Sequence, residues 1–125
     1  MAMTEPQVQI VDAMRELVDA NRGARDVMFA GEQALLRGIQ MIEAGTSVAD
    51  TLRSTAAGQQ RQATQDALSR VVAARHQLRL RVIAECLSDD MTPREIATAW
   101  GFSRQRAARY IQELKAAAPE TVGIP

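Results

Sequence analysis

Guanidinium and amide side chains are concentrated in the segment Ser103–Gln112, which reads Ser-Arg-Gln-Arg-Ala-Ala-Arg-Tyr-Ile-Gln. Arginine donates paired hydrogen bonds to anionic or planar acceptors, and glutamine both donates and accepts. Ser103 predicts a helix start, where a cation in the first turn opposes the helix macrodipole by a few tenths to about 1 kcal/mol. Residues 103–106 contain no acid, so an external anion such as a phosphate would resolve this conflict. Simple solvation of exposed arginines is the alternative.

The residues before this segment predict a second short helix followed by a tight turn. Thr92-Pro93-Arg94-Glu95 has the pattern of a capping box with proline in the first turn. Ala97 is small, as required where two helices cross closely, and Gly101 suits a turn residue with positive φ. We expect the next helix over residues 103–118, ended by Pro119.

Apolar residues around the turn are spaced to form a small core between these two helices and the end of a longer one, Leu78 to Leu87. The expected core residues are Ile96, Phe102, Ala107, Ile111 and Leu114. Trp100 could cap this core or pack on the longer helix.

The stretch Arg-Glu-Ile-Ala, followed by Trp-Gly-Phe-Ser-Arg-Gln-Arg, resembles the helix-turn-helix of bacterial transcription regulators and of sigma-factor region four. The resemblance covers residues 91–114 and implies a trihelical DNA-binding unit over residues 76–118. No hairpin pattern follows Leu114, so no wing is expected. Ala107 stands where the family usually has a larger aliphatic residue, which predicts looser packing there.

The resemblance also implies which residues contact double-stranded DNA, because the second helix of the motif enters the major groove. Arg104 would donate two hydrogen bonds to guanine, and Gln105 would make the paired contact with adenine. Ser103, Arg106 and Arg109, with Thr92 and Arg94 before the turn, are better placed for phosphates. The full expected set is Thr92, Arg94, Ser103, Arg104, Gln105, Arg106, Ala108, Arg109 and Gln112.

The rest of the chain also predicts helices, so the expected fold is all-α. Aromatic residues make up only 3% of the 125 residues, and strand-like alternation is not sustained anywhere. Thr4 predicts the start of a first helix that continues to Ala44-Gly45. Ser47 predicts a short second helix that ends near Ala56–Gly58, and a third helix is expected from about Gln59 to Leu87.

Small and apolar residues in the first helix follow a heptad pattern. Its positions are Ile10, Met14, Leu17, Asn21, Ala24, Met28, Gly31, Leu35, Gly38 and Ile42. The third helix has a stripe of Ala63, Ala67, Val71, Ala74, Leu78 and Val82, widened by Leu68, Val72 and Ile83. Gly31 and Gly38 would permit close approach of another helix. Asn21-Arg22-Gly23 could break the first helix, although we favour a continuous one.

A long antiparallel pair of helices would leave apolar surface unburied on both members, and a second copy would cover it. We therefore expect residues 1–75 to form a dimerisation segment and residues 119–125 to form a flexible tail. The expected dimerisation contacts are Ile10, Met14, Leu17, Met28, Leu35 and Ile42.

The distribution of charge and the potentially reactive side chains limit the classes of function that fit this chain. Residues 1–66 contain six Arg and nine acids, a net charge of −3, whereas residues 67–125 contain nine basic residues and six acids, a net charge of +3. The single histidine, His76, has no metal-binding partner at helical spacing, and Cys86 is more consistent with burial than with a redox role. No catalytic pair or phosphate-binding glycine loop occurs, so we expect neither an enzyme nor a metal or other cofactor.

These features predict a sequence-specific, homodimeric transcriptional regulator, soluble in the bacterial cytoplasm and associated with the nucleoid, with no membrane partner. A nucleoid-associated protein without sequence preference is one alternative. A helical adaptor that binds RNA polymerase or another regulator is another, favoured by the negative N-terminal half. A ligand-sensing repressor would require a pocket that sequence does not reveal.

Overall fold

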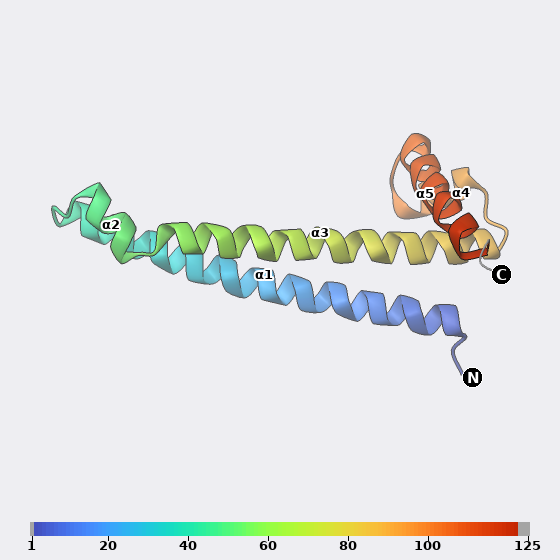
Figure 1. Ribbon diagram of the computed structural model, residues 1–125, viewed down its shortest axis with the longest axis horizontal. Helices are drawn as coiled ribbons and strands as arrows, with labels where there is room; N and C mark the ends of the chain where they lie inside the picture. The colour runs from blue at the N-terminus through green and yellow to red at the C-terminus, as the bar shows by residue number, and fades with distance from the viewer. Residues whose placement is uncertain (1, 123–125) are drawn as a thin grey trace. The chain divides into compact units, whose positions relative to one another are not determined.

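The computed structural model describes the backbone of residues 2–122 and the side chains up to Ala117. The described residues form five α-helices and no strand (Figure 1), which confirms the all-α expectation. The helices are α1 (Glu5–Glu43), α2 (Val48–Ser54), α3 (Ala57–Ser88), α4 (Pro93–Trp100) and α5 (Arg104–Val122). The chain divides into two units, one of Arg15–Arg75 and the other of Met1–Met14 with His76–Pro125. The segment expected over residues 1–75 therefore contributes to both units.

Local signals set both ends of α1. At its start, the Thr4 amide donates to Gln7 Oε1 at 3.0 Å and the Gln7 amide donates to Thr4 Oγ1 at 3.3 Å. At its end, Gly45 has φ +97°, and the Thr46 amide donates to the Met41 carbonyl at 2.9 Å. This is a Schellman motif, which uses glycine because the left-handed conformation strains other residues. The helix is continuous through Asn21–Gly23, as expected.

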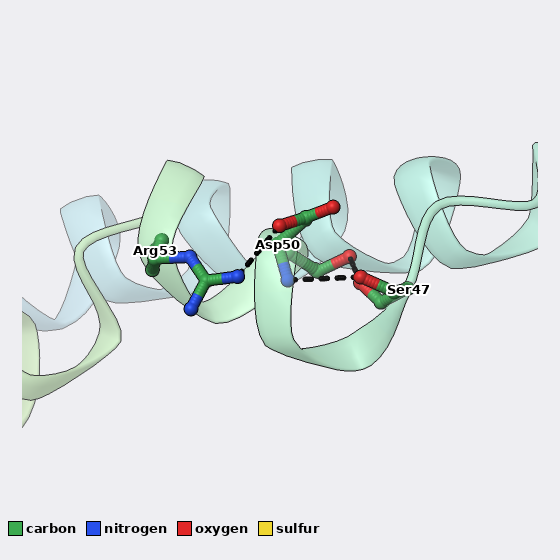
Figure 2. A network of polar contacts seen from close by, with 4 residues as sticks. Ser47, Asp50 and Arg53 are labelled. Atoms are coloured by element: carbon green, nitrogen blue, oxygen red, sulfur yellow. Dashed lines mark hydrogen bonds and ion pairs between the residues drawn. The ribbon is translucent and has the colours of Figure 1, made fainter.

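A polar network holds the start of α2 (Figure 2). Ser47 Oγ accepts a hydrogen bond from the Asp50 amide at 3.1 Å, and Arg53 Nη2 lies 2.7 Å from Asp50 Oδ1. The hydrogen bonds of Asp50, first with Arg53 and then with Ser47, lower the pKa of its carboxyl. The ion pair is exposed to solvent, so its contribution to stability is small. The network mainly defines where α2 begins.

Within the unit Arg15–Arg75, α3 lies beside α1 and runs in the opposite direction (Figure 1). Gln60 Nε2 donates to the Val27 carbonyl at 2.9 Å, and Arg70 Nη2 lies 3.0 Å from Glu16 Oε1. A small apolar cluster lies between the two helices. It consists of Ala20, Ala24, Val71 and Ala74, with Leu17 and Ala67 packed against it.

The buried face of α1 differs from the predicted heptad seam. Ala24 and Gly38 are buried as expected, but Ala20 and Ala34 replace their neighbours Asn21 and Leu35 as buried positions. Small side chains allow two helices to pack closely. In α1, Ala20 and Ala24 face α3, whereas larger side chains such as Leu35 are exposed. A Cβ at Gly31 would lie 3.0 Å from Gln60 Nε2, so the Gln60 side chain of α3 packs directly over this glycine.

The predicted stripe of α3 also needs correction. Val71, Ala74 and Leu78 are buried as expected, whereas Ala63, Leu68 and Val72 are exposed. Only a narrow strip of α3 is buried. The wider stripe expected from helical spacing is therefore only partly buried.

In the other unit, α4 and α5 pack against the C-terminal end of α3 (Figure 1), and Arg81 of α3 donates a hydrogen bond to Gln9 of α1 at 2.9 Å. Ile83, Ile96 and Ile111 form the buried cluster, and each stabilises the fold by about 1.5–3 kcal/mol. The partly buried residues around it are Cys86, Leu87, Met91, Phe102, Tyr110 and Leu114. The predicted core of this region is confirmed, with Ala107 fully buried and the Trp100 ring 6.2 Å from that of Phe102.

The predicted end of α5 at Ala118 is wrong, because the helix continues through Pro119 to Val122. Proline removes one backbone donor and crowds the carbonyl four residues earlier, which weakens a helix without always ending it. Of the expected tail, residues 123–125 lie outside the described residues.

Candidate functional site

The connection between α4 and α5 has a defined backbone geometry. Thr92 and Glu95 form a reciprocal capping box, with the Thr92 amide 3.0 Å from Glu95 Oε1 and the Glu95 amide 3.2 Å from Thr92 Oγ1. Gly101 ends α4 with φ +87°, and its amide donates to the Ala97 carbonyl at 2.9 Å. Ser103 Oγ then accepts from the Arg106 amide at 3.1 Å, which caps α5. The predicted signals of this turn are therefore present.

The capping box also determines the electrostatics of Glu95. Hydrogen bonds from the backbone and then the side chain of Thr92 lower the pKa of this carboxyl. No acid occupies the first turn of α5, in contrast to α4. The exposed amides at the start of α5 are therefore not matched by a nearby carboxylate on the same turn.

The outer face of α5 carries most of the expected contact residues. Ala107 and Ile111 face the core, and helical spacing turns Gln105, Arg109 and Gln112 to the opposite side. The exposed members of the expected set are Thr92, Arg94, Ser103, Arg104, Gln105, Ala108, Arg109 and Gln112. In the part of the chain that the structure describes, the side chains of Arg104, Gln105 and Arg109 make no hydrogen bond or ion pair. Their donors are available to an external ligand.

Arg106 differs from the other expected residues because its side chain is partly buried. Its Nε donates to the Tyr110 hydroxyl at 3.0 Å, and its guanidinium lies 5.8 Å from the centres of both the Phe102 and Tyr110 rings. The aromatic contacts hold the guanidinium on one side of α5. An external anion would therefore bind a guanidinium that the protein already holds in place.

Sequence reasoning missed Tyr110 and Arg79 as parts of this site. Arg79 Nη1 of α3 donates to the Tyr110 hydroxyl at 3.1 Å, and Arg79 Nε is buried without a partner among the described residues. Burial of Tyr110 opposes its ionisation, but hydrogen bonds and positive charge from Arg106 and Arg79 outweigh it and lower the pKa of the phenol. The spacing of four between Arg106 and Tyr110 was a usable signal. Nothing in the sequence pointed to Arg79.

His76 has a carboxylate partner, although none lies at helical spacing in its own helix. Its Nε2 lies 2.9 Å from Glu113 Oε1, so the partner comes from α5 and not from its own helix. These two residues line an open cavity of about 470 Å³ with Arg106, Arg109 and Tyr110. No group of three or more His, Cys, Asp or Glu side chains suited to a metal occurs among the described residues.

Cys86 packs against the Ile83, Ile96 and Ile111 cluster and is partly buried. Burial first, and then the negative charges of Asp89 and Glu85, raise the pKa of its thiol. A reactive cysteine requires the opposite shift, since the thiolate is the nucleophile. The packing role expected from the sequence is the better supported one.

The residues expected to form a dimer occupy two kinds of position. Leu17 packs within the chain against the cluster of Ala20 and Val71, and Ile10 is partly buried. The other four are exposed at 45–75% of their surface: Met14 48%, Met28 54%, Leu35 72% and Ile42 49%. These four are available to a partner.

No described helix combines the length and apolarity needed to cross a membrane. Comparison of the chain with protein families, with curated protein sequences and with solved structures yields no match.

Proposed function

We propose that this chain is a sequence-specific DNA-binding transcriptional regulator that acts as a homodimer. Residues 76–118 would form a helix-turn-helix in which α4 crosses the phosphate backbone and α5 enters the major groove. The observation that carries this proposal is the outer face of α5. Gln105 and Arg109 are exposed there, and Arg104 is exposed in the first turn of the same helix. None of the three side chains has an internal partner among the described residues.

The roles of these residues follow from their donors. Arg104, in the first turn, would donate two hydrogen bonds to guanine, and Gln105 would pair with adenine. Arg109 would contact a phosphate, as would Arg106, whose guanidinium is held in place by Tyr110. Thr92 and Arg94, at the start of α4, would also contact phosphates. The acid-free first turn of α5 supports this arrangement, because a phosphate there would favour the helix macrodipole.

The proposal is tested first by selecting bound sequences from a random pool of DNA duplexes. An enriched palindromic motif is expected, since two recognition helices would read two half-sites. Arg104→Ala should then weaken binding to the selected site by roughly 1–3 kcal/mol and relax base preference at one position. Arg22→Ala is the matched control, because it removes the same charge from an exposed site outside the proposed interface.

The salt dependence of binding separates phosphate contacts from base contacts. Arg109→Ala should reduce the slope of log affinity against log salt by about 1, because one phosphate contact is lost. Equal losses on selected and random DNA for Arg104→Ala would contradict its base-reading role. Enrichment without a motif would indicate nucleoid-type binding instead.

A helical adaptor for RNA polymerase or another regulator is the second candidate. The exposed apolar side chains of Arg15–Arg75 favour it, because a protein partner would bury them. In that case no DNA would be retained even at low salt.

A further inference from the structure

The unit Arg15–Arg75 buries small side chains and exposes large ones. Its buried apolar residues are Ala20, Ala24, Ala34, Val71 and Ala74. Its large exposed side chains include Met28 (54%), Leu35 (72%), Ile39 (51%), Ile42 (49%), Leu52 (54%), Leu68 (45%) and Val72 (62%). Monomeric soluble proteins rarely expose continuous apolar patches of this kind unless the patch binds something.

These seven side chains share one face of the helix pair. Leu35, Ile39 and Ile42 of α1 line a groove of about 430 Å³, together with Leu52 of α2 and with Arg61 and Thr64 of α3. Its lining also includes Gly31, Ala34 and Gly38, whose small size leaves the space open.

The same face extends beyond the groove. Met28 precedes Leu35 by one heptad, and Leu68 and Val72 follow Thr64 by four and eight residues, so each continues its row on the same side of its helix. We call these seven residues, with the groove that they border, the α1/α3 face.

We propose that the α1/α3 face binds the same face of a second copy of this chain. Met28, Leu35 and Ile42 repeat at seven-residue intervals, which is the spacing of side chains that insert between those of a facing helix. The face thus offers both a row of protruding side chains and a groove that can receive such a row. A two-fold contact requires this self-complementarity, because the same patch must serve on both partners.

Charge around the face also favours a second copy over a different kind of partner. Glu32 and Glu43 of α1 and Arg61 of α3 are exposed and form no ion pair within the described residues. A two-fold arrangement in which α1 of one copy lies across α3 of the other would pair these opposite charges. Residues 15–75 contain eight Arg and seven acids, so the unit has no charge excess to select nucleic acid.

The α1/α3 face supplies the apolar centre of the proposed dimer interface. Specific interfaces bury about 800 Å² per partner from about 20–30 residues. The α1/α3 face extends over residues 28–42 and 61–72 and includes Leu52, with large apolar side chains along its length. This inference rests on the proposed function, which requires two recognition helices. Its test measures the mass of the assembly and does not depend on DNA binding.

The test is sedimentation of the full chain over a range of concentrations, with Leu35→Glu as the disrupting variant. The wild-type chain should sediment at twice its 13.7 kDa mass. Leu35→Glu should raise the dimer dissociation constant more than about 100-fold, because a symmetric interface loses the side chain twice. Leu35 is the most exposed residue of the face at 72%, so its replacement removes little from the fold of one chain.

Phe29→Glu is the matched control. Phe29 is 62% exposed and lines a separate groove with Ala30 and Arg37. This variant introduces the same charge one helix position away from Met28, and it should remain a dimer. Monomerisation by both variants alike would overturn the assignment of the face, as would a Leu35→Glu chain that stays dimeric.

Hydrogen exchange of the unmodified chain provides a second readout that does not depend on how a variant folds. Raising the concentration through the dimerisation range should slow exchange in residues 28–42 and 61–72. A wild-type chain that is monomeric at about 100 µM, or protection confined to other segments, would overturn the inference. Arg104→Ala should also sediment as a dimer. A wild-type chain that dimerises through this face but binds no DNA would count against the proposed function alone.

Discussion

Arg79 of α3 donates a hydrogen bond to the hydroxyl of Tyr110 on α5, with an N–O distance of 3.1 Å. Arg106 donates to the same oxygen from one turn earlier on α5, at 3.0 Å. A single hydroxyl therefore connects α5 to the long helix and holds one of the arginines at the edge of the proposed DNA interface. The Arg79 guanidinium depends on this acceptor, since its Nε is buried and unpaired among the described residues.

Tyr110→Phe should lower the free energy of unfolding by about 1–3 kcal/mol, because it leaves partly buried donors of Arg79 and Arg106 without their acceptor. Urea denaturation at neutral pH measures the change. Arg79→Met provides the matched comparison, since it removes one of the donors. The double variant should lose less stability than the two single losses added together. Additive losses would show that the hydrogen bond does not couple the two helices.

Glu95→Gln should reduce the pH dependence of stability in the acid range. The pKa of Glu95 in the folded chain lies below its ordinary value of 4.5, so its contribution is complete above that value and is lost as pH falls through the folded pKa. The stability difference between wild type and Glu95→Gln should therefore be largest near neutral pH and shrink below about pH 4.5. Thermal unfolding between pH 3 and pH 7 measures it. A difference that is constant with pH would contradict the capping role of the ionised carboxylate.

Gly38→Ala should stabilise the chain by about 0.5–1 kcal/mol, because alanine is favoured over glycine inside a helix. The new Cβ would lie 3.5 Å from Thr51 Cγ2, which is an ordinary contact. Gly31→Ala is the paired comparison, since its Cβ would lie 3.0 Å from Gln60 Nε2 and must displace it. Displacement costs the hydrogen bond to the Val27 carbonyl, so the helical gain should be largely cancelled. Denaturation of both variants measures the contrast, and an equal gain at both sites would contradict the close approach at Gly31.

The sequence alone was sufficient for features that depend on neighbouring residues in the chain. Thr92 with Glu95, Ser103, and Gly101 each act through hydrogen bonds or backbone conformation within four residues, so their types and spacing predict the ends of α4 and the start of α5. The apolar spacing of Ile96, Ala107 and Ile111 likewise predicts which side of each short helix is buried. Each of these short helices has a single apolar side, so only that side can be buried in the core.

Tertiary structure decided the features that depend on a partner helix. In α1 both the small and the large apolar residues fall at heptad spacing, so periodicity could not distinguish the face of Ala20 and Ala34 from that of Met28 and Leu35. Close approach to α3 selects the small side chains for the interior and leaves the large ones exposed. The contacts of Tyr110 with Arg79 and of Glu113 with His76 also join residues distant in the chain. Their pairing depends on how α5 packs on α3, because such a contact forms only after the two helices are brought together.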